Sequence, residues 1–176
     1  IRHFEHAWLK ESWATYIEAL WIQDHLGEDH FSYEMEMQAD LYIKETTNHY
    51  VRPIVTREYN SSWNMFDQHL YPGSFHWLLK KNINKNINKI TIKMKIIGGS
   101  WRVHMLREML GEEVFWKGVR EYVDENSVGV VTTTEWLYAL ENSSSRSLIP
   151  FFDQWIYGLG FPKLEGFIFL LFKIFL

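Results

Sequence analysis

A helical repeat of apolar side chains in the first part of the chain constrains the fold more than any other sequence feature. Apolar residues recur there three and four positions apart, as they do on one side of a helix. These residues are Trp13, Tyr16, Ile17, Leu20 and Trp21. Gly27 follows at a position where a helix commonly ends. The pattern predicts a helix that carries Glu11 on its first turn and stops at Gly27.

Further helix signals follow along the rest of the chain. The predicted helices are Glu28–Tyr50, Ser100–Leu110, Glu112–Glu125, Thr134–Glu141 and Leu148–Tyr157. The three threonines at 132–134 offer N-caps for the helix that contains Glu135. Gly111 and Gly158 occupy places where helix ends favour a left-handed residue, and residues 60–63 are predicted to form a loop. No alternating apolar period is long enough for a sheet, so we predict an all-α fold.

Composition excludes several classes of function. Hydrophobic residues make up 47% of the 176 positions, which is enough for one domain with a core. The chain has no cysteine, so disulfides, thiolate zinc sites and a cysteine nucleophile are all excluded. The formal charge of −4 gives no reason to expect a nucleic-acid partner. Charged residues before Trp8 interrupt any signal peptide, and the absence of cysteine fits a reducing compartment, so we expect a cytoplasmic protein.

One internal segment departs from the composition of the rest. Residues 80–97 contain six lysines and no acid, and Lys81–Lys89 reads K-N-I-N-K-N-I-N-K. A basic surface loop is one interpretation of residues 74–98. Translated non-coding sequence is the interpretation that we favour, because adenine- and thymine-rich codons encode these residue types. The apolar run Phe167–Leu176 has the same possible origin, and it is shorter than the roughly twenty residues of a membrane helix, so a membrane partner is not expected.

Five blocks of the sequence resemble the zinc aminopeptidases related to aminopeptidase N, and they occur in that family's order. The block W-L-K-E-S-W-A-T-Y at Trp8–Tyr16 is similar to the family's W-L-N-E-[GS]-[FW]-A-[TS]-Y. The other four resemble H-P-I/V, I-F-D-x-x-x-Y, the helix that follows this tyrosine, and F-x-x-W…G-[YF]-P-x-[LV]. They are Arg52–Ile54, Met65–Tyr71, Trp101–Arg107 and Phe152–Leu164. The resemblance therefore reaches from about residue 6 to residue 164.

The resemblance implies a thermolysin-like metallopeptidase that hydrolyses N-terminal residues from peptides. Glu11 matches the glutamate that is the family's third protein ligand to zinc, and Tyr71 matches the tyrosine that hydrogen-bonds the developing oxyanion. Residues 1–166 then correspond to the helical C-terminal part of the catalytic domain, interrupted by residues 74–98, and residues 167–176 are not native to that domain. Lys10 replaces the family's asparagine and brings a cation close to Glu11.

The H-E-x-x-H motif that supplies the other two zinc ligands and the general base does not occur in the sequence. His3 and His6 do not replace it, because they are three residues apart and Glu5 precedes the second histidine. We therefore expect no activity from this polypeptide alone. The alternative function is a non-catalytic helical interaction module that has kept the fold.

Overall fold

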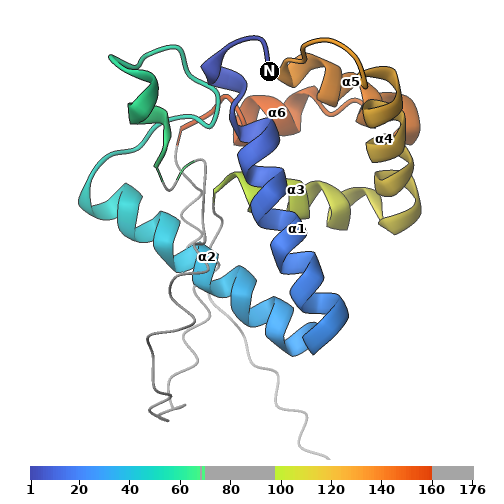
Figure 1. Ribbon diagram of the computed structural model, residues 1–176, viewed down its shortest axis with the longest axis horizontal. Helices are drawn as coiled ribbons and strands as arrows, with labels where there is room; N and C mark the ends of the chain where they lie inside the picture. Colours follow the sequence, from blue (N-terminus) through green and yellow to red (C-terminus); the bar gives the residue numbers. More distant parts are fainter. Residues whose placement is uncertain (68, 70–97, 160–176) are drawn as a thin grey trace, which may run out of the picture.

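The computed structural model describes residues 1–67, 69 and 98–159, and throughout these ranges the regular structure is helical (Figure 1). Its helices are α1 Trp8–Leu26, α2 Glu28–Asn48, α3 Gly99–Leu110, α4 Glu112–Glu125, α5 Thr133–Ser144 and α6 Ile149–Trp155. Two 3-10 helices, η1 Phe4–His6 and η2 Ser62–Met65, complete the set. The predicted all-α fold is confirmed. None of the helices in these ranges combines the length and apolar character that crossing a membrane requires.

Glycines end two of the helices as the sequence predicts. Gly27 separates α1 from α2 with φ of 91°, and Gly111 separates α3 from α4 with φ of 80°. Both values lie in the left-handed region, where a side chain would cost energy. The prediction for Gly158 is wrong, because its φ is not positive. Glycine is required there for space, since an added Cβ would lie 2.4 Å from the carbonyl oxygen of Gln154.

The order of the helices brings α1 into the middle of the molecule. In Figure 1, α1 and α2 form a hairpin, α3 crosses α1, and the packed pair α4 and α5 lies at the far side from α2. Residues 50–67 run alongside η1 at the end of the molecule where α1 begins. The predicted loop at residues 60–63 overlaps η2, which starts where the Ser61 side chain accepts a hydrogen bond from the Trp63 backbone N–H.

The core is built on the aromatic side chains of α1, α4 and α5. The Trp13 ring lies 6.0 Å from the Phe115 ring and 5.4 Å from the Trp136 ring, measured between centroids. Tyr122 contacts Trp136 in the same cluster, at 5.1 Å. Rings in this range of distances add attraction beyond the area that they bury. The aromatic cluster therefore fixes α1 against the α4–α5 pair.

Candidate metal and substrate site

Two buried contacts fix the first turn of α1, which carries Glu11. Trp8 is fully buried, and its indole Nε1–H donates to the Thr133 hydroxyl over 3.0 Å. The backbone N–H of Glu11 donates to the carbonyl oxygen of Ala7, and Trp13 enters the aromatic core. The two tryptophans that flank Glu11 in the sequence therefore point inward and hold the helix on which the glutamate lies.

The carboxylate of Glu11 is half-buried and lies beside a cation. Its side chain is 17% exposed, and its Oε1 lies 2.9 Å from the Nζ of Lys10. Lys10 is 61% exposed, so its ammonium group stays hydrated and the ion pair contributes little to stability. Within the described ranges, no three His, Cys, Asp or Glu side chains converge as a metal site. Glu11 can thus supply one ligand to a metal, but the described residues do not form a zinc site by themselves.

His6 is committed to structural hydrogen bonds, and His3 is exposed. The Nδ1 of His6 accepts from the backbone N–H of Thr133 over 3.2 Å, and its Nε2 lies 3.1 Å from Glu5 Oε1. Arg57 in turn donates to both carboxylate oxygens of Glu5, and this hydrogen bonding holds the pKa of Glu5 below its usual range. Both ring nitrogens of His6 are therefore occupied by protein groups.

A buried polar cluster that sequence reasoning missed lies in the block that leads to Tyr71. Arg52 donates from Nε and Nη2 to the two oxygens of Asp67, over 2.8 and 2.6 Å. Tyr50 donates its hydroxyl to Asp67 over 2.5 Å, and His69 donates its backbone N–H over 3.0 Å. Tyr71 itself lies outside the described residues. One sequence signal could have indicated this cluster. Arg52 and Asp67 carry opposite charges and lie in two of the blocks that resemble the family, Arg52–Ile54 and Met65–Tyr71.

The cluster has a marked effect on acidity. Burial acts to raise the pKa of Asp67, but hydrogen bonds from His69, Arg52 and Tyr50 outweigh it and hold that pKa well below its usual range. Burial and the neighbouring Asp67 raise the pKa of Tyr50 to about 12. Asp67 is therefore ionised and Tyr50 is neutral throughout the physiological range.

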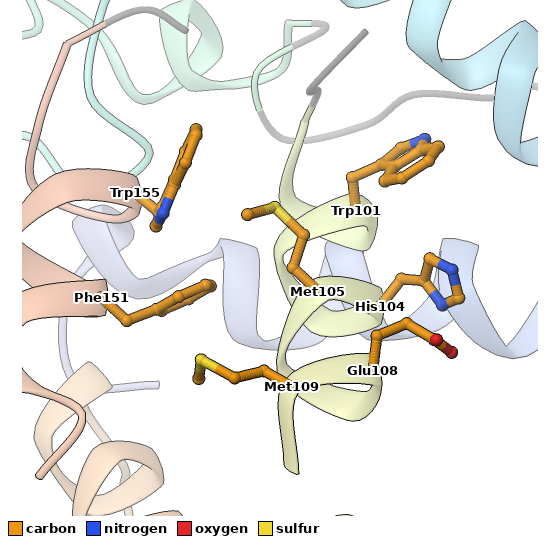
Figure 2. A pocket seen from close by; sticks show the side chains of 7 residues that line it. All are labelled: Trp101, His104, Met105, Glu108, Met109, Phe151 and Trp155. Carbon is orange, nitrogen blue, oxygen red and sulfur yellow. The ribbon is translucent and has the colours of Figure 1, made fainter. Parts of the chain in front are cut away.

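Two grooves flank α3. The first has a volume of about 460 Å³ and lies between α3 and α6. In Figure 2, Met105 and Met109 project from α3 toward Phe151 and Trp155 of α6. The second, of about 340 Å³, lies between α2 and α3 and is lined by Phe31, Trp101 and His104 among others. Glu11 lines neither groove, so neither is a substrate pocket at the candidate metal ligand.

His104 lies between α1, α2 and α3. Its Nδ1 is 3.0 Å from the Tyr16 hydroxyl, which also accepts a hydrogen bond from Arg107 over 3.1 Å. Burial lowers the pKa of His104 and raises the pKa of Tyr16 to about 12. No local sequence signal indicated this contact, because residues 16 and 104 belong to different helices.

Comparison with known proteins finds aminopeptidases. The chain is 33% identical to aminopeptidase 2 of Candida albicans over 76 residues, which are 43% of this chain and 8% of that protein. It is 21% identical to aminopeptidase N of Lactococcus lactis over 146 residues, 75% of this chain and 17% of that protein. It is 32% identical to the alanine/arginine aminopeptidase of Saccharomyces cerevisiae over 79 residues, 45% of this chain and 9% of that protein.

The matched residues are a small part of these relatives. The chain spans less than a fifth of the length of the curated relatives described above. No family model matches the chain.

Proposed function

Because the relatives described above are aminopeptidases, we propose that the chain belongs to the aminopeptidase N family and forms the helical part of a peptidase catalytic domain that removes N-terminal residues from peptides. In this proposal Glu11 is one of three protein ligands to zinc, and Tyr71 donates a hydrogen bond to the oxyanion of the tetrahedral intermediate. Zinc, when bound, would supply the acidity that turns a coordinated water into hydroxide near neutral pH. Residues 1–166 without 74–98 make up the domain, and the apolar tail 167–176 is extraneous.

The observation that carries the proposal is that the blocks of family resemblance meet in space. Arg52 in one block binds Asp67 in another through two hydrogen bonds. Arg102 is buried and donates from Nε to the carbonyl oxygen of Trp155 over 3.0 Å, which joins two further blocks. Segments that are far apart in sequence thus form one packed unit around the helix that carries Glu11.

The groove between α3 and α6 supports the second candidate, a non-catalytic interaction module. Met105, Met109, Phe151 and Trp155 form its apolar lining, and flexible methionines with aromatic rings suit a protein partner. The two candidates differ in the gene. A peptidase requires H-E-x-x-H in frame about eighteen residues before Glu11. Sequencing that upstream region decides between them, since a module has no need of the motif.

We predict that this polypeptide alone has no aminopeptidase activity. One zinc ligand and no general base cannot activate water. Purified chain with added zinc should give background rates on aminoacyl amides. Zinc-dependent turnover that Glu11→Gln abolishes would contradict this prediction.

In a protein that carries H-E-x-x-H ahead of Glu11, the two proposed residues should behave differently. Glu11→Ala should release zinc, as measured by metal content after dialysis. Tyr71→Phe should retain zinc and lower kcat by a factor on the order of a hundred to a thousand, the usual loss for one oxyanion donor. Asp24→Asn on the same helix and Tyr138→Phe, both exposed, are matched controls that should change neither property. An unchanged kcat in Tyr71→Phe would show that the tyrosine assignment is wrong.

A further inference from the structure

The two grooves beside α3 lie on either side of one row of side chains. Trp101, His104 and Glu108 line both grooves, and they are three and four residues apart, so they share one face of the helix. The groove volumes, about 460 and 340 Å³, are in the range of about 300 to 1,000 Å³ that is usual for ligand sites. A ligand that crosses this row of side chains therefore contacts both grooves at once.

The groove between α3 and α6 is apolar. Figure 2 shows the side chains of Met105 and Met109 directed from α3 toward α6, where Phe151 and Trp155 lie. Met109 is 43% exposed although its side chain is large and apolar. Thioethers adapt to the shape of a ligand and make favourable contacts with aromatic rings. This groove therefore suits a bulky apolar side chain.

The groove between α2 and α3 combines carboxylates with aromatic rings. Three glutamates and two large aromatic rings are among the side chains that line it, and none of the described lysines or arginines lines it. They are Glu28, Glu36, Glu108, Phe31 and Trp101. The face of an aromatic ring attracts a cation, and a carboxylate can bind a guanidinium through two parallel hydrogen bonds. This groove therefore suits the side chain of an arginine.

His104 offers a hydrogen-bond donor between the two grooves. The Tyr16 hydroxyl accepts from Arg107 over 3.1 Å and lies 3.0 Å from His104 Nδ1. Tyr16 is fully buried, so its own hydrogen needs an acceptor, and Nδ1 supplies it. The hydrogen of the neutral ring is then on Nε2, which points away from Tyr16. Burial lowers the pKa of His104 although the nearby Glu108 and Glu28 raise it, so the ring carries no positive charge at neutral pH that would repel an arginine.

We propose that a partner protein docks across α3 through a short peptide segment that has a bulky apolar residue about three positions from an arginine. The apolar side chain enters the groove between α3 and α6. The arginine binds Glu108 and Glu28 beside Trp101. A backbone carbonyl oxygen between the two side chains accepts a hydrogen bond from His104 Nε2. The spacing follows from size, because a helix with its side chains is about 10 Å across and an extended chain advances about 3.3 Å per residue.

This proposal rests on the second candidate function, the interaction module, and adds the chemistry of its partner. It does not use Glu11, Tyr71 or zinc, so the two proposals fail separately. Peptides that do not bind would refute the docking site and leave the sequencing of the upstream region as the test of the peptidase.

Binding of labelled peptides to the full chain tests the docking site. Four six-residue peptides, each also made in reverse order, separate the two features. L-F-A-A-R-R carries both, L-F-A-A-Q-Q and A-A-A-A-R-R carry one each, and L-F-A-A-E-E reverses the charge. Fluorescence anisotropy should show that L-F-A-A-R-R, in one of its two directions, binds on the order of tenfold more tightly than each of the other three. No binding, equal affinities, or tighter binding of L-F-A-A-E-E would overturn the proposal.

Substitutions on each side of α3 assign the two features to their grooves. Glu108→Gln should reduce the preference for arginine over glutamine from about tenfold to about threefold, because Glu28 remains. Met109→Gln should weaken the binding of both peptides by a similar factor. The matched controls are Glu113→Gln and Val123→Gln, at exposed positions of α4 that line neither groove, and they should change neither affinity. A wild-type preference in Glu108→Gln would overturn the proposal.

A measurement on the unaltered chain covers the case in which the variants fail to fold. Addition of L-F-A-A-R-R should shift the indole Nε1–H signals of Trp101 and Trp155 in ¹⁵N spectra. It should leave the signals of Trp21 and Trp63 in place, since these exposed rings line neither groove. The reverse pattern would put the peptide elsewhere and overturn the proposal. A dimer that Met109→Gln dissociates and the peptide does not would also overturn it, because a second copy of the chain would then occupy the groove.

Discussion

At the scale of the residue, Asp67 is the centre of the polar cluster that it forms with Arg52, Tyr50 and His69. It accepts two hydrogen bonds from Arg52 and one from the Tyr50 hydroxyl, whereas the other acceptors that Arg52 reaches are uncharged backbone carbonyl oxygens. We predict that Asp67→Asn lowers the free energy of unfolding by about 3 to 5 kcal/mol, because it leaves a buried guanidinium without its charged partner. Urea unfolding followed by tryptophan fluorescence gives the value. The exposed Asp124→Asn is the matched control and should change it by less than about 0.5 kcal/mol.

The pH dependence of this loss follows from the direction of the pKa shift. The pKa of Asp67 is depressed in the folded chain, so its stabilising contribution is fully present above the unfolded value of about 3.9 and is lost as pH falls toward the folded value. The difference in unfolding free energy between wild type and Asp67→Asn should therefore be constant above about pH 5 and shrink below pH 4. A difference that grows in acid would contradict the assignment of Asp67 as the ionised centre of the cluster.

At the scale of the element, α5 depends on a capping box. The Thr132 hydroxyl accepts from the Thr134 N–H, while the Glu135 carboxylate accepts from the Thr132 N–H over 2.7 Å. We predict that Thr132→Ala lowers the free energy of unfolding by about 1 kcal/mol, or the melting temperature by about 2 to 4 °C. Thr134→Ala, at an exposed position in the same turn, is the control and should have a smaller effect. Equal losses in the two variants would show that the cap does not stabilise α5.

The helices could be predicted because their signals are local. The spacing of Trp13, Tyr16 and Leu20 and the glycine at 27 are properties of neighbouring residues, and α1 begins and ends where they indicate. The sequence offered three threonines as caps for α5. The structure uses Thr132 because Glu135 is three residues further on, and it turns Thr133 inward to Trp8.

The polar contacts could not be predicted in the same way. The hydrogen bond from Thr133 to His6 joins residues 127 positions apart, and nothing in the local pattern of either segment indicates the other. Glu11 was predictable as a helix residue and as a match to the family's ligand. Its role as a ligand stays a prediction, because the remaining donors of a zinc site are not among the described residues.

At the scale of the whole molecule, the segment between residues 69 and 99 begins and ends at the same place. The carbonyl oxygen of His69 accepts a hydrogen bond from the Gly99 N–H over 3.2 Å, so the chain on both sides of the segment is already in contact. Arg102 adds a hydrogen bond from Nη1 to the Gly98 carbonyl oxygen over 3.1 Å. The described fold therefore needs only a short connection between His69 and Gly99. The predicted insertion, residues 74–98, lies outside the described residues except for Gly98.

This geometry leads to the prediction that deleting residues 74–98 leaves the helical fold intact. Residues 70–73 then close the gap from His69 to Gly99, and a loop about sevenfold shorter costs roughly 1 to 2 kcal/mol less to close, so the variant should be slightly more stable than the full chain. Circular dichroism and urea unfolding measure both effects.

The matched control replaces residues 74–98 with a glycine–serine linker of equal length, which keeps the length of the loop and removes its native sequence. If both variants lose stability by more than about 1 kcal/mol, residues 74–98 make contacts of their own and belong to the folded domain. If the deletion alone is destabilising, the connection through residues 70–73 is too short. If both fold as predicted, the domain is continuous from His69 to Gly99, and a spliced message that joins Gly73 to Gly99 is the expected transcript.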